Sequence, residues 1–146
     1  TEHQGLVALV DKISKGDKPF HPHNIYSTVD IGKKKDPETW RKIFQKIGVK
    51  PGDKVYAVDD TEANARAIAV ATNEYGARPD VYFLDASYGG ERPEKMDGIK
   101  RANTETVSRI TNRALAHVNK HRRESGGEKT EMIPVMLLFV VSLSLL

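Results

Sequence analysis

Two adjacent carboxylates, Asp59 and Asp60, follow the short apolar run 55–58. Such a run is typical of a strand that is buried on both faces of a parallel sheet. Carboxylate oxygens are preferred ligands of Mg²⁺, so an acidic pair at the end of this strand can form a magnesium site. Asp60 or Thr61 can equally cap a following helix by accepting its first N–H groups. Taken alone, the pair is better explained as a cap than as a metal site.

The segments around this pair alternate between helical and strand patterns. Asp36 and Pro37 predict the start of a helix that ends at Gly48. The predicted strands cover 24–29, 55–58 and 81–84, and the predicted helices cover 6–13, 36–48 and 61–75. This alternation favours a parallel sheet with right-handed crossovers, in which ligands bind beyond the carboxyl ends of the strands. Asp85 follows the last of these strands and is expected at the same sheet edge.

We therefore predict an α/β fold, a three-layer Rossmann-like parallel sheet that is incomplete and is followed by a long C-terminal helix. Residues 1–90 are assigned to this α/β core, 91–123 to the long amphipathic helix, 124–131 to a polar linker and 132–146 to an apolar tail. The helix prediction depends on apolar residues with helical spacing, which are Met96, Ile99, Val107, Ile110, Ala114 and Val118.

The apolar tail 132–146 contains no charged residue. A membrane-spanning helix needs about 20 apolar residues, more than this tail supplies. Three interpretations stay open: an anchor that tethers the protein to a membrane, a core element, or an artefact of a misread gene. We expect a cytoplasmic protein, with tethering through this tail as the membrane alternative.

Composition excludes several kinds of chemistry. The 146 residues include no cysteine, which excludes disulfides, thiolate catalysis and cysteine-ligated zinc. The net charge of +3 is small and the basic residues are scattered, so we expect no nucleic-acid partner.

Two short motifs change the interpretation of the acidic pair. Residues 32–38 read Gly-Lys-Lys-Lys-Asp-Pro-Glu, and 58–64 read Val-Asp-Asp-Thr-Glu-Ala-Asn. From Ser27 to Asn64, about a quarter of the chain, the sequence resembles the C-terminal half of the core domain in haloacid dehalogenase-like (HAD) hydrolases. The third motif of that superfamily reads Gly-x-Lys-Pro-Asp-Pro-Glu and the fourth reads Val-Asp-Asp-Ser/Thr-x-x-Asn. The chain departs from the third motif at Lys35, where the superfamily usually has proline.

The resemblance implies a Mg²⁺-dependent phosphatase-type hydrolase that acts on a small phosphorylated substrate. Lys34 would be the catalytic cation, Asp59 and Asp60 would hold Mg²⁺, and Asn64 would contact a metal ligand rather than the metal. The nucleophile of the superfamily is an aspartate in an Asp-x-Asp motif near the N-terminus, and no such motif precedes Ser27. We therefore expect the chain to be a fragment that is inactive alone.

A second resemblance is to rhodanese-like sulfurtransferase domains, through residues 80–85 and the pair Gly89-Gly90. It implies an inactive binding or regulatory domain with Asp59 at the position of the reactive cysteine. Lys34 distinguishes the two interpretations, because only the hydrolase needs a cation there. The sequence specifies neither the substrate nor the oligomeric state.

Overall fold

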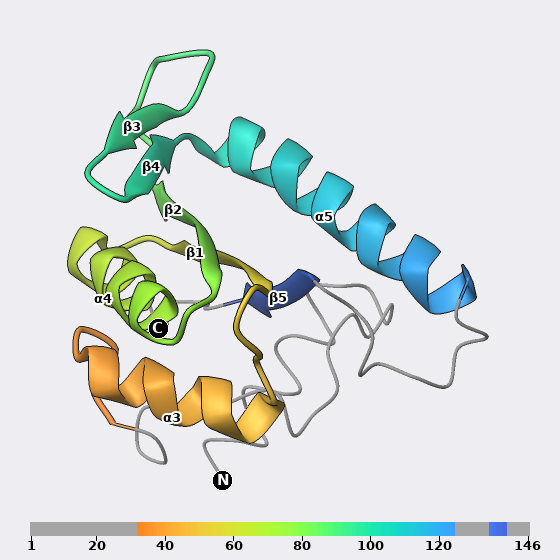
Figure 1. Ribbon diagram of the computed structural model, residues 1–146. Coiled ribbons are helices and arrows are strands. Elements are labelled where there is room, and N and C mark those ends of the chain that lie inside the picture. The colour runs from red at the N-terminus through yellow and green to blue at the C-terminus, as the bar shows by residue number, and fades with distance from the viewer. Residues whose placement is uncertain (1–31, 125–134, 140–146) are drawn as a thin grey trace, which may run out of the picture.

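The computed structural model describes residues 32–124 and 135–139, which form an α/β unit with a mixed sheet (Figure 1). The described elements are α3 (Pro37–Ile47), β1 (Lys54–Asp59), α4 (Glu62–Glu74), β2 (Arg78–Leu84), β3 (Glu94–Met96), β4 (Ile99–Ala102), α5 (Thr104–Glu124) and β5 (Val135–Phe139). The predicted α/β class is confirmed. The helix predicted at 6–13 and the strand predicted at 24–29 lie outside the described residues.

The strand order is β3-β4-β2-β1-β5. Strand β1 pairs in parallel with β2 on one side and with β5 on the other, and β2 pairs in parallel with β4. Strand β3 runs antiparallel to β4. The prediction of a wholly parallel sheet is therefore wrong at this edge.

The antiparallel pair is a hairpin that turns at Asp97 and Gly98, both with positive φ (46° and 89°). An Asp-Gly pair favours a turn in which both residues have positive φ. The backbone twist of such a turn matches the twist of the two strands that it connects. The prediction of a helix from residue 91 is wrong over this stretch. Met96 and Ile99 have helical spacing in the sequence but lie on strands, and α5 begins only at Thr104.

Helix α3 begins and ends where the sequence indicates. The Oδ1 atom of Asp36 accepts a hydrogen bond from the Glu38 N–H at 3.0 Å, and Pro37 occupies the first turn. Gly48 ends the helix with φ of 79°, a left-handed conformation that glycine adopts at little cost. The predicted helix is thus confirmed together with both of its caps.

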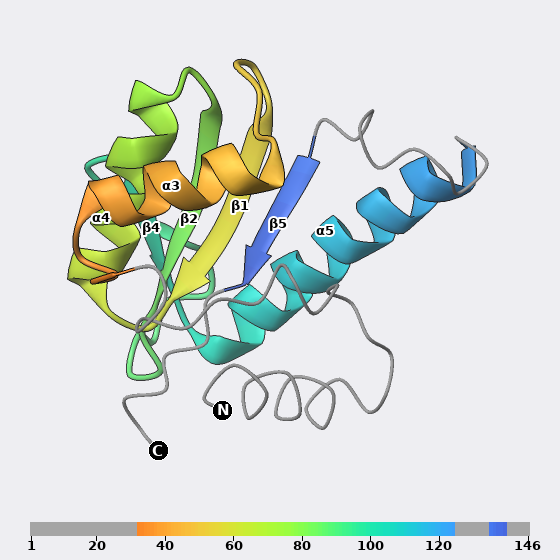
Figure 2. The same ribbon diagram turned by 90° about the horizontal axis from the view of Figure 1, so that it is seen from below.

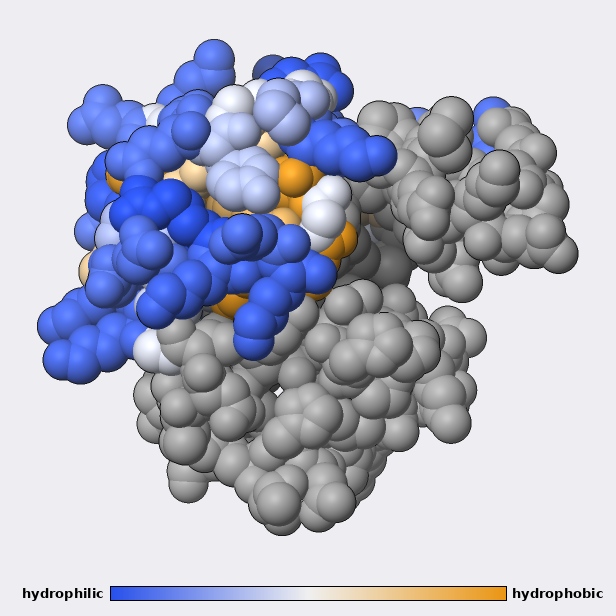
Figure 3. Space-filling model, turned by 60° about the horizontal axis from the view of Figure 1, so that its bottom comes forward, coloured by the Kyte–Doolittle hydropathy of each residue, from blue (hydrophilic) through white to orange (hydrophobic). Residues whose placement is uncertain are grey.

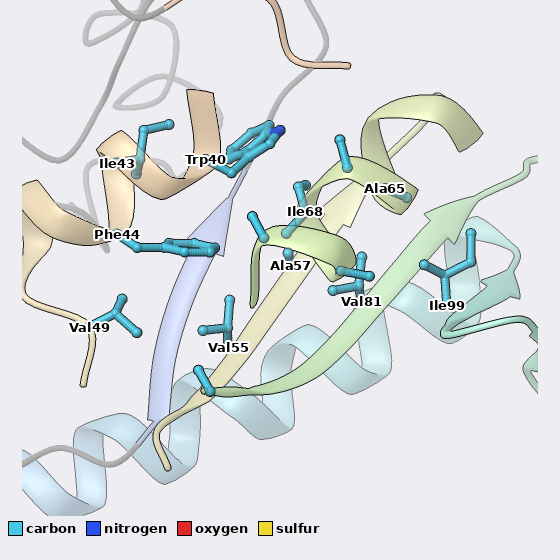
Figure 4. Packing of buried hydrophobic residues seen from close by; sticks show 14 residues of the cluster. Trp40, Ile43, Phe44, Val49, Val55, Ala57, Ala65, Ile68, Val81 and Ile99 are labelled. Carbon is cyan, nitrogen blue, oxygen red and sulfur yellow. The ribbon is translucent and has the colours of Figure 1, made fainter. Parts of the chain in front are cut away.

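The main core lies between the sheet and the helices α3 and α4 (Figure 4). Val55 and Ala57 of β1 face Ile68 of α4, and Phe44 of α3 is fully buried beside them. The α4 face toward the sheet consists mostly of alanines, which let this helix lie close to the strands. This core fixes the position of α4, and hence of its first residues, relative to the end of β1.

Helix α5 covers the opposite face of the sheet (Figure 2). Tyr56 and Tyr82 form a second core with Val107 of α5. The Tyr56 hydroxyl lies 2.8 Å from the Thr111 hydroxyl, a buried hydrogen bond that joins this helix to β1. Strand β1 is therefore covered on both faces, which explains its uninterrupted apolar sequence.

Part of the apolar tail belongs to the sheet, since Val135–Phe139 is β5 and pairs with β1. This agrees with the core-element interpretation for those five residues. Among the helices of the described segments, none has the length and apolar character that crossing a membrane requires. The rest of 132–146, and the linker after residue 124, fall outside those segments.

On the face shown in Figure 3, hydrophilic side chains cover most of the described surface. Val70 of α4 is the one large apolar residue that is exposed in the described part of the chain, with 44% of its surface accessible. At one edge of the sheet, β3 has only three residues, of which Glu94 and Lys95 are charged and exposed. Arg66 of α4 donates hydrogen bonds to the carbonyls of Met96 and Asp97 and so holds the hairpin against α4.

Substitutions on the two sides of α4 should distinguish how much core packing and how much helix propensity contribute to the free energy of unfolding. Ile68→Ala removes a fully buried side chain, and we expect it to lower the free energy of unfolding by about 2–5 kcal/mol. Val70→Ala is the control on the exposed side of the same helix, with an expected change within about 0.5 kcal/mol. Urea unfolding monitored by circular dichroism measures both. Similar losses in the two variants would contradict the described packing of α4.

Candidate active site

Asp59 is the last residue of β1 and is completely buried. Side chains alternate along a strand, so Asp59 shares a face with Val55 and Ala57. That face is covered by α3 and α4. The carboxylate therefore lies at the carboxyl end of the sheet, beneath the start of α4, rather than in solvent.

The two oxygens of Asp59 have different surroundings. Oδ1 accepts hydrogen bonds from the backbone N–H of Thr61 at 2.7 Å and from Asn64 Nδ2 at 3.2 Å. Oδ2 is buried and has no hydrogen-bond partner within the described structure. Buried polar atoms are nearly always paired, because desolvation without a partner is costly. An orphaned carboxylate oxygen is thus a position for a proton or a bound cation.

Burial is the main cause that raises the pKa of the Asp59 carboxyl above its ordinary value. The hydrogen bonds from Thr61 and Asn64 lower this pKa, as does the positive charge of Lys34, while the negative charge of Asp60 raises it. Lys34, Asp60 and Asn64, predicted as site residues with Asp59, all act on this one carboxylate. The fold thus brings together four residues that span positions 34 to 64.

The helix-cap interpretation accounts for only part of the acidic pair. The N-cap of α4 is Thr61, and its side chain makes no capping hydrogen bond. Asp60 is partly exposed, and its contact with the Thr61 hydroxyl is long, at 3.5 Å. Asp59 does satisfy the Thr61 N–H, but with one oxygen only. The Asp60 carboxylate is therefore not used as a cap.

The turn that carries Lys34 is fixed by a residue that the sequence did not single out for this purpose. The indole N–H of Trp40 donates a 2.6 Å hydrogen bond to the Lys34 carbonyl, and Trp40 is itself buried in the core. The Asp36 N–H donates to the Lys33 carbonyl at 3.1 Å and closes the turn. The position of Trp40 in the sequence carries no signal of a bond to a backbone carbonyl.

Asp85, expected at the same edge of the sheet, is engaged in its own loop. Its Oδ1 accepts hydrogen bonds from the N–H and the hydroxyl of Ser87, at 3.0 and 2.6 Å. These bonds hold the pKa of Asp85 below its ordinary value. Arg101 lies 3.7 Å from its other oxygen. Asp85 is therefore occupied by contacts that maintain the loop after β2.

The donor set fits a magnesium ion in part. Two carboxylates, one with an orphaned buried oxygen, match the preference of Mg²⁺ for oxygen ligands and for few protein ligands. Across residues 32–124 and 135–139 no three histidine or acidic side chains gather into a metal-binding group. Water or substrate oxygens would have to supply the remaining ligands.

Comparison of the chain with models of protein families, with curated proteins and with solved structures gives no match. The assignment of the site therefore depends on its own geometry and on the two sequence motifs.

The raised pKa of Asp59 makes a prediction about stability and pH. In the unfolded chain this carboxyl loses its proton near pH 4, while in the folded chain it does so at higher pH. Between these pH values the folded state binds more protons, so this group lowers stability as pH rises. Asp59→Asn removes that contribution. We expect the stability of the variant, relative to wild type, to increase from pH 4 to pH 7 in metal-free buffer, as measured by urea unfolding.

Asp97→Asn, at the exposed hairpin turn, is the control for this measurement and should show no such trend. A stability difference between Asp59→Asn and wild type that is constant across this pH range would contradict the raised pKa.

Trp40→Phe should loosen the lysine turn while leaving the aromatic ring in the core. The variant leaves the Lys34 carbonyl without its donor, a loss of about 1 kcal/mol. Amide hydrogen exchange should become faster at residues 33–35. Tyr56→Phe is the matched control, because it removes one hydrogen bond on the opposite face of the sheet. Unchanged exchange in the turn of Trp40→Phe would show that the indole does not hold it.

Proposed function

We propose that this chain carries the Mg²⁺-binding part of a phosphohydrolase site of the haloacid dehalogenase-like type. Asp59 and Asp60 hold the metal, and Lys34 supplies the second positive charge. The observation that carries this proposal is the buried carboxylate of Asp59, which has one orphaned oxygen and lies under the influence of a lysine charge.

The topology supports a ligand site at this position. From β1 the chain passes through α4 to β2 on one side, and after α5 it returns to β5 on the other side of β1. In open α/β sheets of the Rossmann-like kind, ligands bind at the carboxyl ends of the strands where the connections change direction. We infer such an arrangement here, and Asp59 at the end of β1 lies at that point.

Lys34 favours the hydrolase over the rhodanese-like alternative. A binding domain with Asp59 at the position of a lost cysteine has no need for a cation beside this carboxylate. The indole of Trp40 holds the backbone of Lys34 at 2.6 Å, so the position of the lysine is built into the core packing of α3.

Each residue then has a chemical role. Bound Mg²⁺ would supply charge stabilisation for a transferring phosphoryl group. Lys34 would neutralise the oxygens of the same group, and Asn64 orients Asp59 through its 3.2 Å hydrogen bond. The sequence contains no Asp-x-Asp motif to supply the nucleophile. We therefore propose that the chain binds metal and phosphate but does not hydrolyse phosphoesters unaided.

Mg²⁺ should stabilise the wild-type chain through the acidic pair. At a concentration about ten times Kd, the stabilisation is about 1.4 kcal/mol. This corresponds to a rise of a few degrees in Tm for a chain of this size. Asp59→Asn and Asp60→Asn should each abolish the rise, as measured by thermal unfolding and by titration calorimetry with MgCl₂.

Asp85→Asn is the matched control, because it removes a carboxylate at the same edge of the sheet that has its own partners. It should retain the response to Mg²⁺. An unchanged Tm of wild type at millimolar Mg²⁺, or an equal response in all three variants, would overturn the proposed metal site.

A further inference from the structure

The turn before α3 carries more positive charge than a single phosphoryl group requires. Lys33, Lys34 and Lys35 are consecutive, and the proposed function uses only Lys34. The side chains of Lys33 and Lys35 are exposed. Within the described residues, neither of them takes part in a hydrogen bond or an ion pair through its side chain.

The acidic residues that follow this turn in the sequence are engaged in other contacts. Asp36 accepts the N–H of Glu38 as the cap of α3, and Glu38 pairs with Arg41. Arg41 also pairs with Glu74 of α4. These carboxylates serve the helix start and the contact between α3 and α4. Among residues 32–124 and 135–139, none forms an ion pair with Lys33 or Lys35, so their exposed ammonium groups can bind an anion from solution.

The position of these lysines is defined by the fold. The turn is closed by the Asp36 N–H and joined to the core by the Trp40 indole, and the charge of Lys34 in this turn acts on Asp59 at the end of β1. The Cα atoms of Lys33 and Lys35 are at most about 7.6 Å apart, which is two steps along the chain. Both lysines therefore flank the lysine whose charge acts on Asp59.

A count of charges indicates what these lysines bind. The negative charges of the two aspartates and the double positive charge of one Mg²⁺ would cancel. Lys34 would then face a phosphoryl group with a charge of roughly −1.5 to −2. Lys33 and Lys35 add two further positive charges at the same place, which matches one more phosphate group. Lysine ammonium groups bind phosphate well as point charges.

We propose that the substrate of this site carries a second phosphate close to the transferred one, as in a small diphosphate, and that Lys33 and Lys35 recognise it. This inference rests on the proposed function, because it takes the end of β1 as the place of the transferred group.

The test compares inorganic phosphate with pyrophosphate as probes, by titration calorimetry on the full chain with free Mg²⁺ in excess of both. Wild type should bind pyrophosphate at least about tenfold more tightly than phosphate. The double variant Lys33→Ser/Lys35→Ser should lose this preference and keep its affinity for phosphate. The matched control is Lys42→Ser/Lys50→Ser, which removes two exposed lysines from α3 and the following turn. It should retain the preference.

Equal affinities for the two probes in wild type would overturn the inference, as would a preference that survives in Lys33→Ser/Lys35→Ser. Wild type should also bind a short single-stranded oligonucleotide more weakly than it binds pyrophosphate. Tighter oligonucleotide binding by wild type that is lost in Lys33→Ser/Lys35→Ser would overturn a small substrate. The Mg²⁺ response of Tm separates this result from the metal site. If wild type shows no such response, the proposed function fails, whereas a normal response without a pyrophosphate preference rejects only the role of the two lysines.

Discussion

The site depends on one constraint, which is that a carboxylate ends a strand covered on both faces. The alternation of side chains along β1 directs Asp59 into the apolar layer under α4. Desolvation there raises the pKa of the Asp59 carboxyl. This pKa is lowered by hydrogen bonds from the Thr61 N–H and the Asn64 amide and by the charge of Lys34. Each of these groups comes from a segment that α3 or α4 positions. The packing of the two helices is therefore also what sets the electrostatics of the site.

Trp40 links the core to the site most directly. Its ring belongs to the apolar layer, while its indole N–H reaches out of that layer to the Lys34 carbonyl. A change in how α3 packs on α4 would move this indole and the lysine turn with it. The geometry around Asp59 is thus sensitive to residues that never approach a ligand.

Local signals in the sequence were sufficient for the elements that build the site. Asp36, Pro37 and Gly48 mark both ends of α3, and the apolar runs of β1 and β2 mark the buried strands. The hairpin β3–β4 was missed because Met96 and Ile99, three residues apart, also fit one face of a helix. The pair Asp97-Gly98 was the signal for a tight turn.

Other features depend on contacts that no local pattern encodes. The tail residues of β5 have an apolar sequence that suits an anchor, a strand or a helix equally well, and only pairing with β1 distinguishes these. The grouping of Lys34 with Asp59 was expected from the two motifs and their resemblance to a family, not from spacing. The hydrogen bond of Trp40 depends on the shape of a turn, which is set by tertiary packing.

The short, charged strand β3 affects whether molecules of this protein can associate through the edges of their sheets. A sheet edge exposes unpaired N–H and C=O groups that can recruit a strand from another molecule, and short charged strands resist this. At the β3 edge only three residues are available, and the Arg66 guanidinium ties their turn to α4. Growth of the sheet by addition of a foreign strand is disfavoured on that side. Edge-to-edge self-association of this protein is therefore opposed at β3 by the shortness and the charge of that strand.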